Sequence, residues 1–121
     1  MKKSWMWFLF GALLATGSLA MSARAQNSVV YAAEYNQSTN RFGTIDLLNG
    51  NFTQIATIGT LINDLAYCPT NGMLYGILNS TTLVTFNETN GAITSIGNFN
   101  VSIQSLAFRP SDGVLFGATQ T

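Results

Sequence analysis

Few side chains in this sequence could carry out chemistry. Histidine is absent from its 121 residues, and Cys68 is the only cysteine. Lack of histidine excludes Ser-His-Asp hydrolysis, the two-histidine zinc protease motif and histidine-ligated haem, and one cysteine cannot build a structural zinc site. No glycine-rich phosphate-binding motif occurs either, so the sequence predicts no metal and no cofactor. We interpret Cys68 as a half-buried packing residue rather than a reactive thiol.

Carboxylates remain as candidates, because a glycosidase needs only a pair of Asp or Glu residues at a suitable separation. Asp46 and Asp112 fall in segments that read as turns, where such side chains commonly bond their own backbone. Glu34 and Glu88 fall in predicted loops and are expected to be solvated. Asp64 is the exception, since it comes directly before an apolar segment that we predict to be a strand.

A second copy of that apolar segment follows Ser105, which therefore corresponds to Asp64. These two residues and their preceding neighbours form a candidate polar ligand surface. Its members are Asn63, Asp64, Gln104 and Ser105. The alternative is that they only solubilise a rim, because loop residues are polar by default. No residue is assigned a catalytic role.

The elements that must position these residues repeat at a constant offset of 41, from Leu65 to Leu106. Residues 65–76 and 106–117 share Leu, Ala, Pro, Gly, Leu and Gly at the same places. Most of the other positions keep their shape or polarity. The repeat therefore places equivalent side chains at equivalent points of successive units.

The repeat extends beyond these segments. The same offset places Asn49-Gly50 on Asn90-Gly91, and residues 30–32 match 74–76 as part of an earlier copy. Periods near 40 residues with several short strands per unit are typical of β-propeller blades. In a propeller the entry of the innermost strand opens onto the central channel, which is where the four candidate ligand residues would lie.

Each unit reads as four strands, because its apolar runs are short, rich in β-branched and aromatic residues, and separated by turn residues. The strands are expected at 64–68, 73–78, 82–87 and 92–97. Pro69 to Gly72 and Pro110 to Gly113 predict tight turns in which glycine takes a positive φ. The strands are apolar on both sides, so both sheet faces are expected to be covered. Gly76 and Gly117 predict a close approach of the backbone of one blade to the next.

The predicted fold class is all-β, a partial β-propeller of about two four-stranded antiparallel blades, preceded by a signal-peptide helix. The propeller domain covers residues 26–121, in units of about 27–63, 64–104 and 105–121. Closed propellers use about four to eight blades, which 96 residues cannot supply. We therefore expect an N-terminal piece of a longer protein, or copies that associate to finish the ring.

The repeat resembles that of secreted bacterial β-propellers of the quinoprotein amine dehydrogenase β-chain-like (WD-repeat-like) superfamily. The resemblance covers residues 29–121 and is carried by core and turn positions. These are Leu65, Ala66, Pro69, Gly72, Leu74 and Gly76, with Leu106, Ala107, Pro110, Gly113, Leu115 and Gly117. Such positions imply a location and a shape rather than an activity.

The first 25 residues read as a signal peptide, because Lys2 and Lys3 precede a short apolar run. Ala23 and Ala25 suit signal peptidase, which predicts cleavage after Ala25 and a secreted, periplasmic or cell-surface location. The alternative is an uncleaved anchor, but the run is shorter than the ~20 residues that span a bilayer. Cleavage leaves two arginines against five carboxylates, too little positive charge for nucleic acid.

The sequence favours an exported, non-enzymatic propeller module that binds a protein or a glycan, or that serves as a surface scaffold. The alternative is the N-terminal fragment of a propeller enzyme, either a quinoprotein-like dehydrogenase or a carbohydrate-active enzyme. Its catalytic residues would then lie in blades outside this sequence. A third interpretation is a truncated gene product without function.

Overall fold

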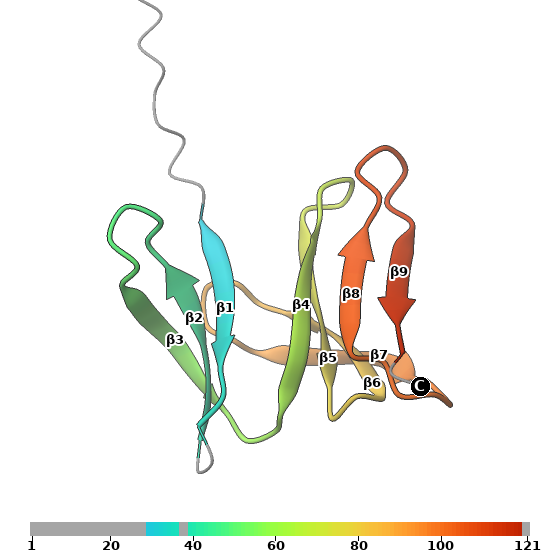
Figure 1. Ribbon diagram of the computed structural model, residues 1–121, viewed down its shortest axis with the longest axis horizontal. Helices are drawn as coiled ribbons and strands as arrows, with labels where there is room; N and C mark the ends of the chain where they lie inside the picture. Colours follow the sequence, from blue (N-terminus) through green and yellow to red (C-terminus); the bar gives the residue numbers. More distant parts are fainter. Residues whose placement is uncertain (1–28, 37–38, 120–121) are drawn as a thin grey trace, which may run out of the picture.

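Nine β-strands form three antiparallel sheets in the computed structural model, which describes residues 29–36 and 39–119 (Figure 1). The first sheet contains β1 (Val30–Glu34), β2 (Asn40–Ile45) and β3 (Phe52–Ile58). The central sheet contains β4 (Ile62–Cys68), β5 (Met73–Leu78), β6 (Thr82–Phe86) and β7 (Ile93–Asn98). The last sheet contains β8 (Ser105–Phe108) and β9 (Leu115–Ala118).

The all-β prediction is confirmed, since the described residues contain no helix. The strands predicted in the central sheet lie within two residues of the observed ones at every end. Only one sheet among the described residues has four strands, whereas about two were expected. The predicted signal peptide and its helix lie outside the described residues. In the part of the chain described, no helix is long and apolar enough to cross a membrane.

The turns follow the local chemistry predicted for them. Gly72 and Gly113 have φ of 69° and 71°, in the left-handed region that only glycine enters without strain. Asn71 Oδ1 accepts a hydrogen bond from the Met73 amide, and Asp112 Oδ1 accepts one from the Val114 amide. These bonds fix the reversals between β4 and β5 and between β8 and β9. The turn role predicted for such side chains is confirmed here.

The repeat is also visible in the backbone pairing. Leu65 pairs with Gly76 in the central sheet, and Leu106 pairs with Gly117 in the last sheet, at the same offset of 41. The register between β2 and β3 shifts after Phe42, and the register between β6 and β7 shifts after Leu83, again 41 residues later. The units therefore share the same strand pairing, including the position of the register shift.

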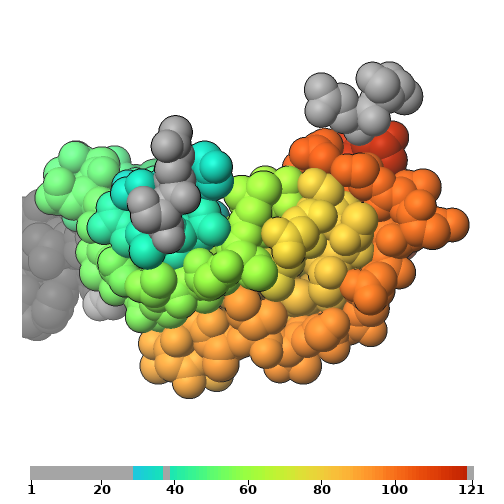
Figure 2. Space-filling model, turned by 90° about the horizontal axis from the view of Figure 1, so that it is seen from below, coloured from blue at the N-terminus to red at the C-terminus, as the bar shows by residue number. Residues whose placement is uncertain are grey.

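Strand β5 buries side chains on both faces of the central sheet, because its successive side chains point to opposite sides. The edge strand β7 is exposed along its whole length. Leu74 and Leu78 pack toward the first sheet, while Ile77 packs toward the last sheet. The core between the first and central sheets consists of Phe42, Ile58, Ile62, Leu74, Leu78, Val84 and Phe86. The core between the central and last sheets contains Ala66, Ile77, Ile103 and Leu106. Figure 2 shows the sheets side by side from cyan through yellow to orange.

Candidate functional site

The four candidate ligand residues lie where the central sheet meets the last sheet. Asn63 Oδ1 accepts a hydrogen bond of 2.6 Å from the Ser80 amide, and Gln104 Nε2 donates one of 3.1 Å to Ser80 Oγ. The structure thus brings Asn63 and Gln104 together through the turn between β5 and β6. Ser105 begins β8 and is exposed.

Both carboxylate oxygens of Asp64 accept hydrogen bonds from backbone amides. Oδ1 accepts a hydrogen bond from the Leu65 amide at 2.8 Å, and Oδ2 accepts one from the Leu106 amide at 2.6 Å. Charge-assisted bonds of this kind are stronger than neutral ones. The carboxylate therefore joins β4 to β8, and a ligand at this position would compete with a structural contact.

Ser80 stands at the centre of this junction. It adopts a positive φ of 64°, which is uncommon for a residue with a side chain. Its carbonyl accepts a hydrogen bond from the Ile103 amide at 2.7 Å, so the turn holds the connection between β7 and β8. The hydrogen bonds of Ser80 thus link the central sheet to the segment that leads into β8.

A groove between the first and central sheets is the other candidate site, and its aromatic lining was not predicted. Its volume is about 360 Å³. The residues that line it are Val29, Tyr31, Leu65, Tyr67, Leu74 and Glu88. Tyrosines beside a single carboxylate give an amphipathic surface that contacts apolar groups and also offers hydrogen bonds.

Tyr31 and Glu88 form the polar contact in the groove. The Tyr31 hydroxyl donates a hydrogen bond of 2.7 Å to Glu88 Oε2, across the boundary between the two sheets. Burial, this hydrogen bond and the negative charge of Glu88 together raise the pKa of Tyr31 to about 12. The phenol therefore stays protonated at neutral pH and acts as a donor.

The predictions for the two glutamates hold only in part. Glu88 lies in a turn, as predicted, but it is half-buried and bonded to Tyr31. Glu34 ends β1 instead of lying in a loop, and its side chain is 41% exposed and forms an ion pair with Arg41. Sequence reasoning missed the groove because it treated Glu88 as a solvated loop residue. The match of residues 30–32 with 74–76 was the available signal, since it makes Tyr31 the equivalent of a packed strand residue.

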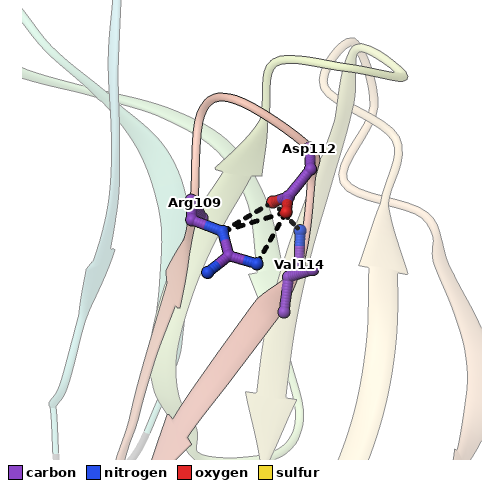
Figure 3. Close-up of polar contacts among 3 residues, drawn as sticks. All are labelled: Arg109, Asp112 and Val114. Atoms are coloured by element: carbon purple, nitrogen blue, oxygen red, sulfur yellow. Dashed lines mark hydrogen bonds and ion pairs between the residues drawn. The ribbon is translucent and has the colours of Figure 1, made fainter.

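The turn between β8 and β9 carries the closest charge pair of the last sheet (Figure 3). Arg109 Nε donates to Asp112 Oδ1 at 2.8 Å, and Nη2 donates to Oδ2 at 2.6 Å. Arg109 holds the pKa of the Asp112 carboxyl below its ordinary value. Figure 3 shows that Asp112 also accepts a hydrogen bond from the Val114 amide, so the Asp112 carboxylate stabilises the turn.

Cys68 is buried, with 2% of its surface exposed, and not half-buried as predicted. Its sulfur lies 3.2 Å from Thr70 Oγ1, and this hydrogen bond lowers the pKa of the thiol although burial opposes it.

No group of three or more acidic or cysteine side chains able to hold a metal ion occurs within residues 29–36 and 39–119. No protein-family model matches the chain, and none of the curated proteins matches it.

Proposed function

We propose that this chain is an exported, non-enzymatic β-propeller module that acts by binding a protein or a glycan in the groove between its first two sheets. The observation that supports this is the repeated packing of one antiparallel sheet on the next. Tyr75 of the central sheet packs on Phe108 of the last sheet, with ring centroids 5.0 Å apart. At the equivalent positions, Tyr31 of the first sheet and Tyr67 of the central sheet both line the groove. Propellers also pack each sheet on the next, which supports the proposal.

The last sheet supports the proposal from its open face. Phe116 is equivalent to Tyr75 at the offset of 41, but 51% of its surface is exposed. Val114 and Ala107 are exposed as well. A surface built to the same pattern as a buried one favours cover by a further sheet, either from more of the same polypeptide or from another copy.

The groove supports a binding role in preference to a scaffold alone. Tyr67 lines it and is 51% exposed, so a ligand can reach the ring without unfolding any strand. Exposed aromatic side chains with one polar end are enriched at binding surfaces. The hydroxyl of Tyr31 and the carboxylate of Glu88 add a polar contact at the same place.

The proposal can be tested on the full chain expressed with its own amino terminus in a bacterial host. We expect the protein outside the cytoplasm, with an intact mass that shows cleavage after Ala25. The exported protein would then be applied to glycan and peptide arrays, alongside Tyr67→Ala and the equally exposed Ile96→Ala on β7. Binding lost in Tyr67→Ala and kept in Ile96→Ala supports the proposal. Retention of the uncleaved chain in the cytoplasm, or binding unaffected by Tyr67→Ala, contradicts it.

A further inference from the structure

In the described part of the chain, the first sheet has no counterpart of a strand that the other two sheets contain. Residues 30–32 match residues 74–76, so β1 is the equivalent of β5 and not of β4. In the central sheet β5 lies between β4 and β6, and in the last sheet β9 pairs with β8. Among the residues described, β1 pairs with β2 alone. Within residues 29–36 and 39–119, no strand occupies the position along the edge of β1 that is equivalent to β4 and β8.

The groove lies on this open side. It is lined by Val29 and Tyr31 from the start of the first sheet and by Leu65 and Tyr67 from β4 (Figure 1 shows β1 and β4 as neighbours). An edge strand leaves half of its backbone amides and carbonyls without a partner from the sheet. Strand addition would satisfy those groups, and the added side chains would fill the groove.

The pairing of β4 with β5 in the central sheet indicates which side chains an added strand would need beside β1. In the central sheet Ala66 pairs with Tyr75, and Cys68 pairs with Met73. If an added strand paired with β1 in the same way, its small residue would lie opposite Tyr31. The residue two places later on the added strand would lie opposite Val29. Ala66 packs in the same apolar cluster as Leu106. A small residue on the added strand would pack in the same way on Leu65, the equivalent of Leu106.

The negative charge of Glu88 indicates which residue the added strand would need opposite Val29. The residue opposite Val29 would point into the groove near Glu88, because Val29 and Glu88 line it together. A positive side chain there would meet a half-buried carboxylate that already accepts a bond from Tyr31. In β8 and the residue after it, Leu106-Ala107-Phe108-Arg109, the equivalent position is Arg109.

On the basis of the binding function proposed above, we propose that β1 accepts an extended segment of a partner polypeptide as a fourth, antiparallel strand. The segment has the pattern apolar, small, aromatic, basic. The small residue faces Leu65, and the basic residue pairs with Glu88. The surface is thus a strand-addition site and not a pocket for a small molecule.

The probe is a synthetic peptide with the sequence of residues 104–110, added to the full exported chain. Its matched control carries Ala107→Phe, which overfills the place opposite Tyr31. The readout is amide hydrogen exchange, followed strand by strand. At a peptide concentration ten times its Kd, we expect exchange in β1 to slow about tenfold, while exchange in β7, an edge strand of the central sheet, is unchanged.

A second pair of measurements tests the charge. Arg109→Ala in the peptide, or Glu88→Gln in the protein, should weaken binding several-fold, and the two changes together should weaken it little further. Equal protection by the Ala107→Phe peptide, or no protection of β1 by the probe, overturns the proposal. Protection of β1 that rises with protein concentration alone would assign the edge to self-association and also overturn it. Groove-dependent glycan or protein binding in the array experiment would still leave the broader function standing.

Discussion

Asp64 Oδ2 accepts a hydrogen bond of 2.6 Å from the backbone amide of Leu106, a residue that lies in another sheet. The other oxygen of the same carboxylate accepts the Leu65 amide. Leu65 and Leu106 are equivalent residues of the repeat, so one side chain binds the same backbone group in two successive units. Of the described polar contacts, this one joins β4 and β8 most directly.

Removal of this carboxylate should therefore loosen the last sheet. We expect Asp64→Ala to lower the free energy of unfolding by about 1–3 kcal/mol, because two partly buried amides lose a charged acceptor. Asp64→Asn keeps one acceptor oxygen and should cost less. The measurement is urea unfolding followed by circular dichroism.

Ser105→Ala is the matched control, since Ser105 is the repeat equivalent of Asp64 but is exposed. Its effect should stay within about 0.5 kcal/mol. If Asp64→Ala were as mild as Ser105→Ala, the bond to Leu106 would carry no stability.

The regular parts of the fold could be predicted from sequence because their causes are local. Gly72 and Gly113 specify turns through φ, and the side chains of Asn71 and Asp112 bond amides two residues ahead. Strand positions follow from short apolar runs between such turns. The repeat adds an independent check, since equivalent errors would have to occur twice.

The candidate sites depended on contacts distant in sequence, and these could not be predicted. Tyr31 and Glu88 are 57 residues apart, and nothing near Glu88 indicates that a phenol will reach it. Asp64 was singled out from the other carboxylates as a candidate ligand residue, and that role stays a prediction. Its bond to the Leu106 amide, however, follows from how two sheets pack and not from any spacing along the chain.

Tyr31 provides a prediction on pH. Replacement of Glu88 by Gln removes the charge and the anionic acceptor, so the pKa of Tyr31 should fall from about 12 toward its ordinary value of 10.0. Burial persists and should keep part of the elevation. Carbon NMR of the tyrosine rings during a pH titration separates Tyr31 from the other tyrosines. Asp112→Asn, in the turn of the last sheet, should leave the pKa of Tyr31 unchanged.

The same shift predicts how stability depends on pH. The pKa of Tyr31 is raised in the folded state, so the folded protein holds this proton more tightly than the unfolded chain. The resulting stabilisation is fully present below pH 10.0 and is lost as the pH rises through about 12. Urea midpoints of the wild type and Glu88→Gln should therefore converge across that range. Midpoints that stay parallel would contradict the assignment.

Phe116 provides a prediction on assembly. If a further sheet or another copy covers the open face of the last sheet, Phe116→Ser should weaken that association about tenfold or more, because a buried Phe contributes roughly 1.5–3 kcal/mol. Ile96→Ser is the control, since Ile96 is equally exposed but lies on the edge strand β7. Sedimentation velocity over a range of concentrations measures the effect. If the two variants associated equally well, the open face of the last sheet would not be an interface.

Gly76 and Gly117 occupy equivalent strand positions, but their surroundings differ from the predicted approach of a neighbouring backbone. A Cβ at Gly76 would lie 2.6 Å from Phe86 Cε2 and 3.2 Å from the Asp64 carbonyl oxygen, both within the central sheet. At Gly117 the nearest atom would be Ile103 Cγ2 at 3.1 Å, on a side chain that can shift. The glycine at 76 therefore makes room for a ring and a carbonyl of its own sheet.

This difference predicts unequal effects for one substitution at two equivalent positions. Gly76→Ala should lower the free energy of unfolding by about 1–3 kcal/mol, because Phe86 is buried against Phe42 and cannot move away. Gly117→Ala should cost less, since the gain of roughly 0.5–1 kcal/mol from replacing a strand glycine offsets a small shift of Ile103. Urea unfolding of both variants measures the contrast. If Gly117→Ala were the more damaging change, the side chain of Phe86 would not be what requires glycine at 76.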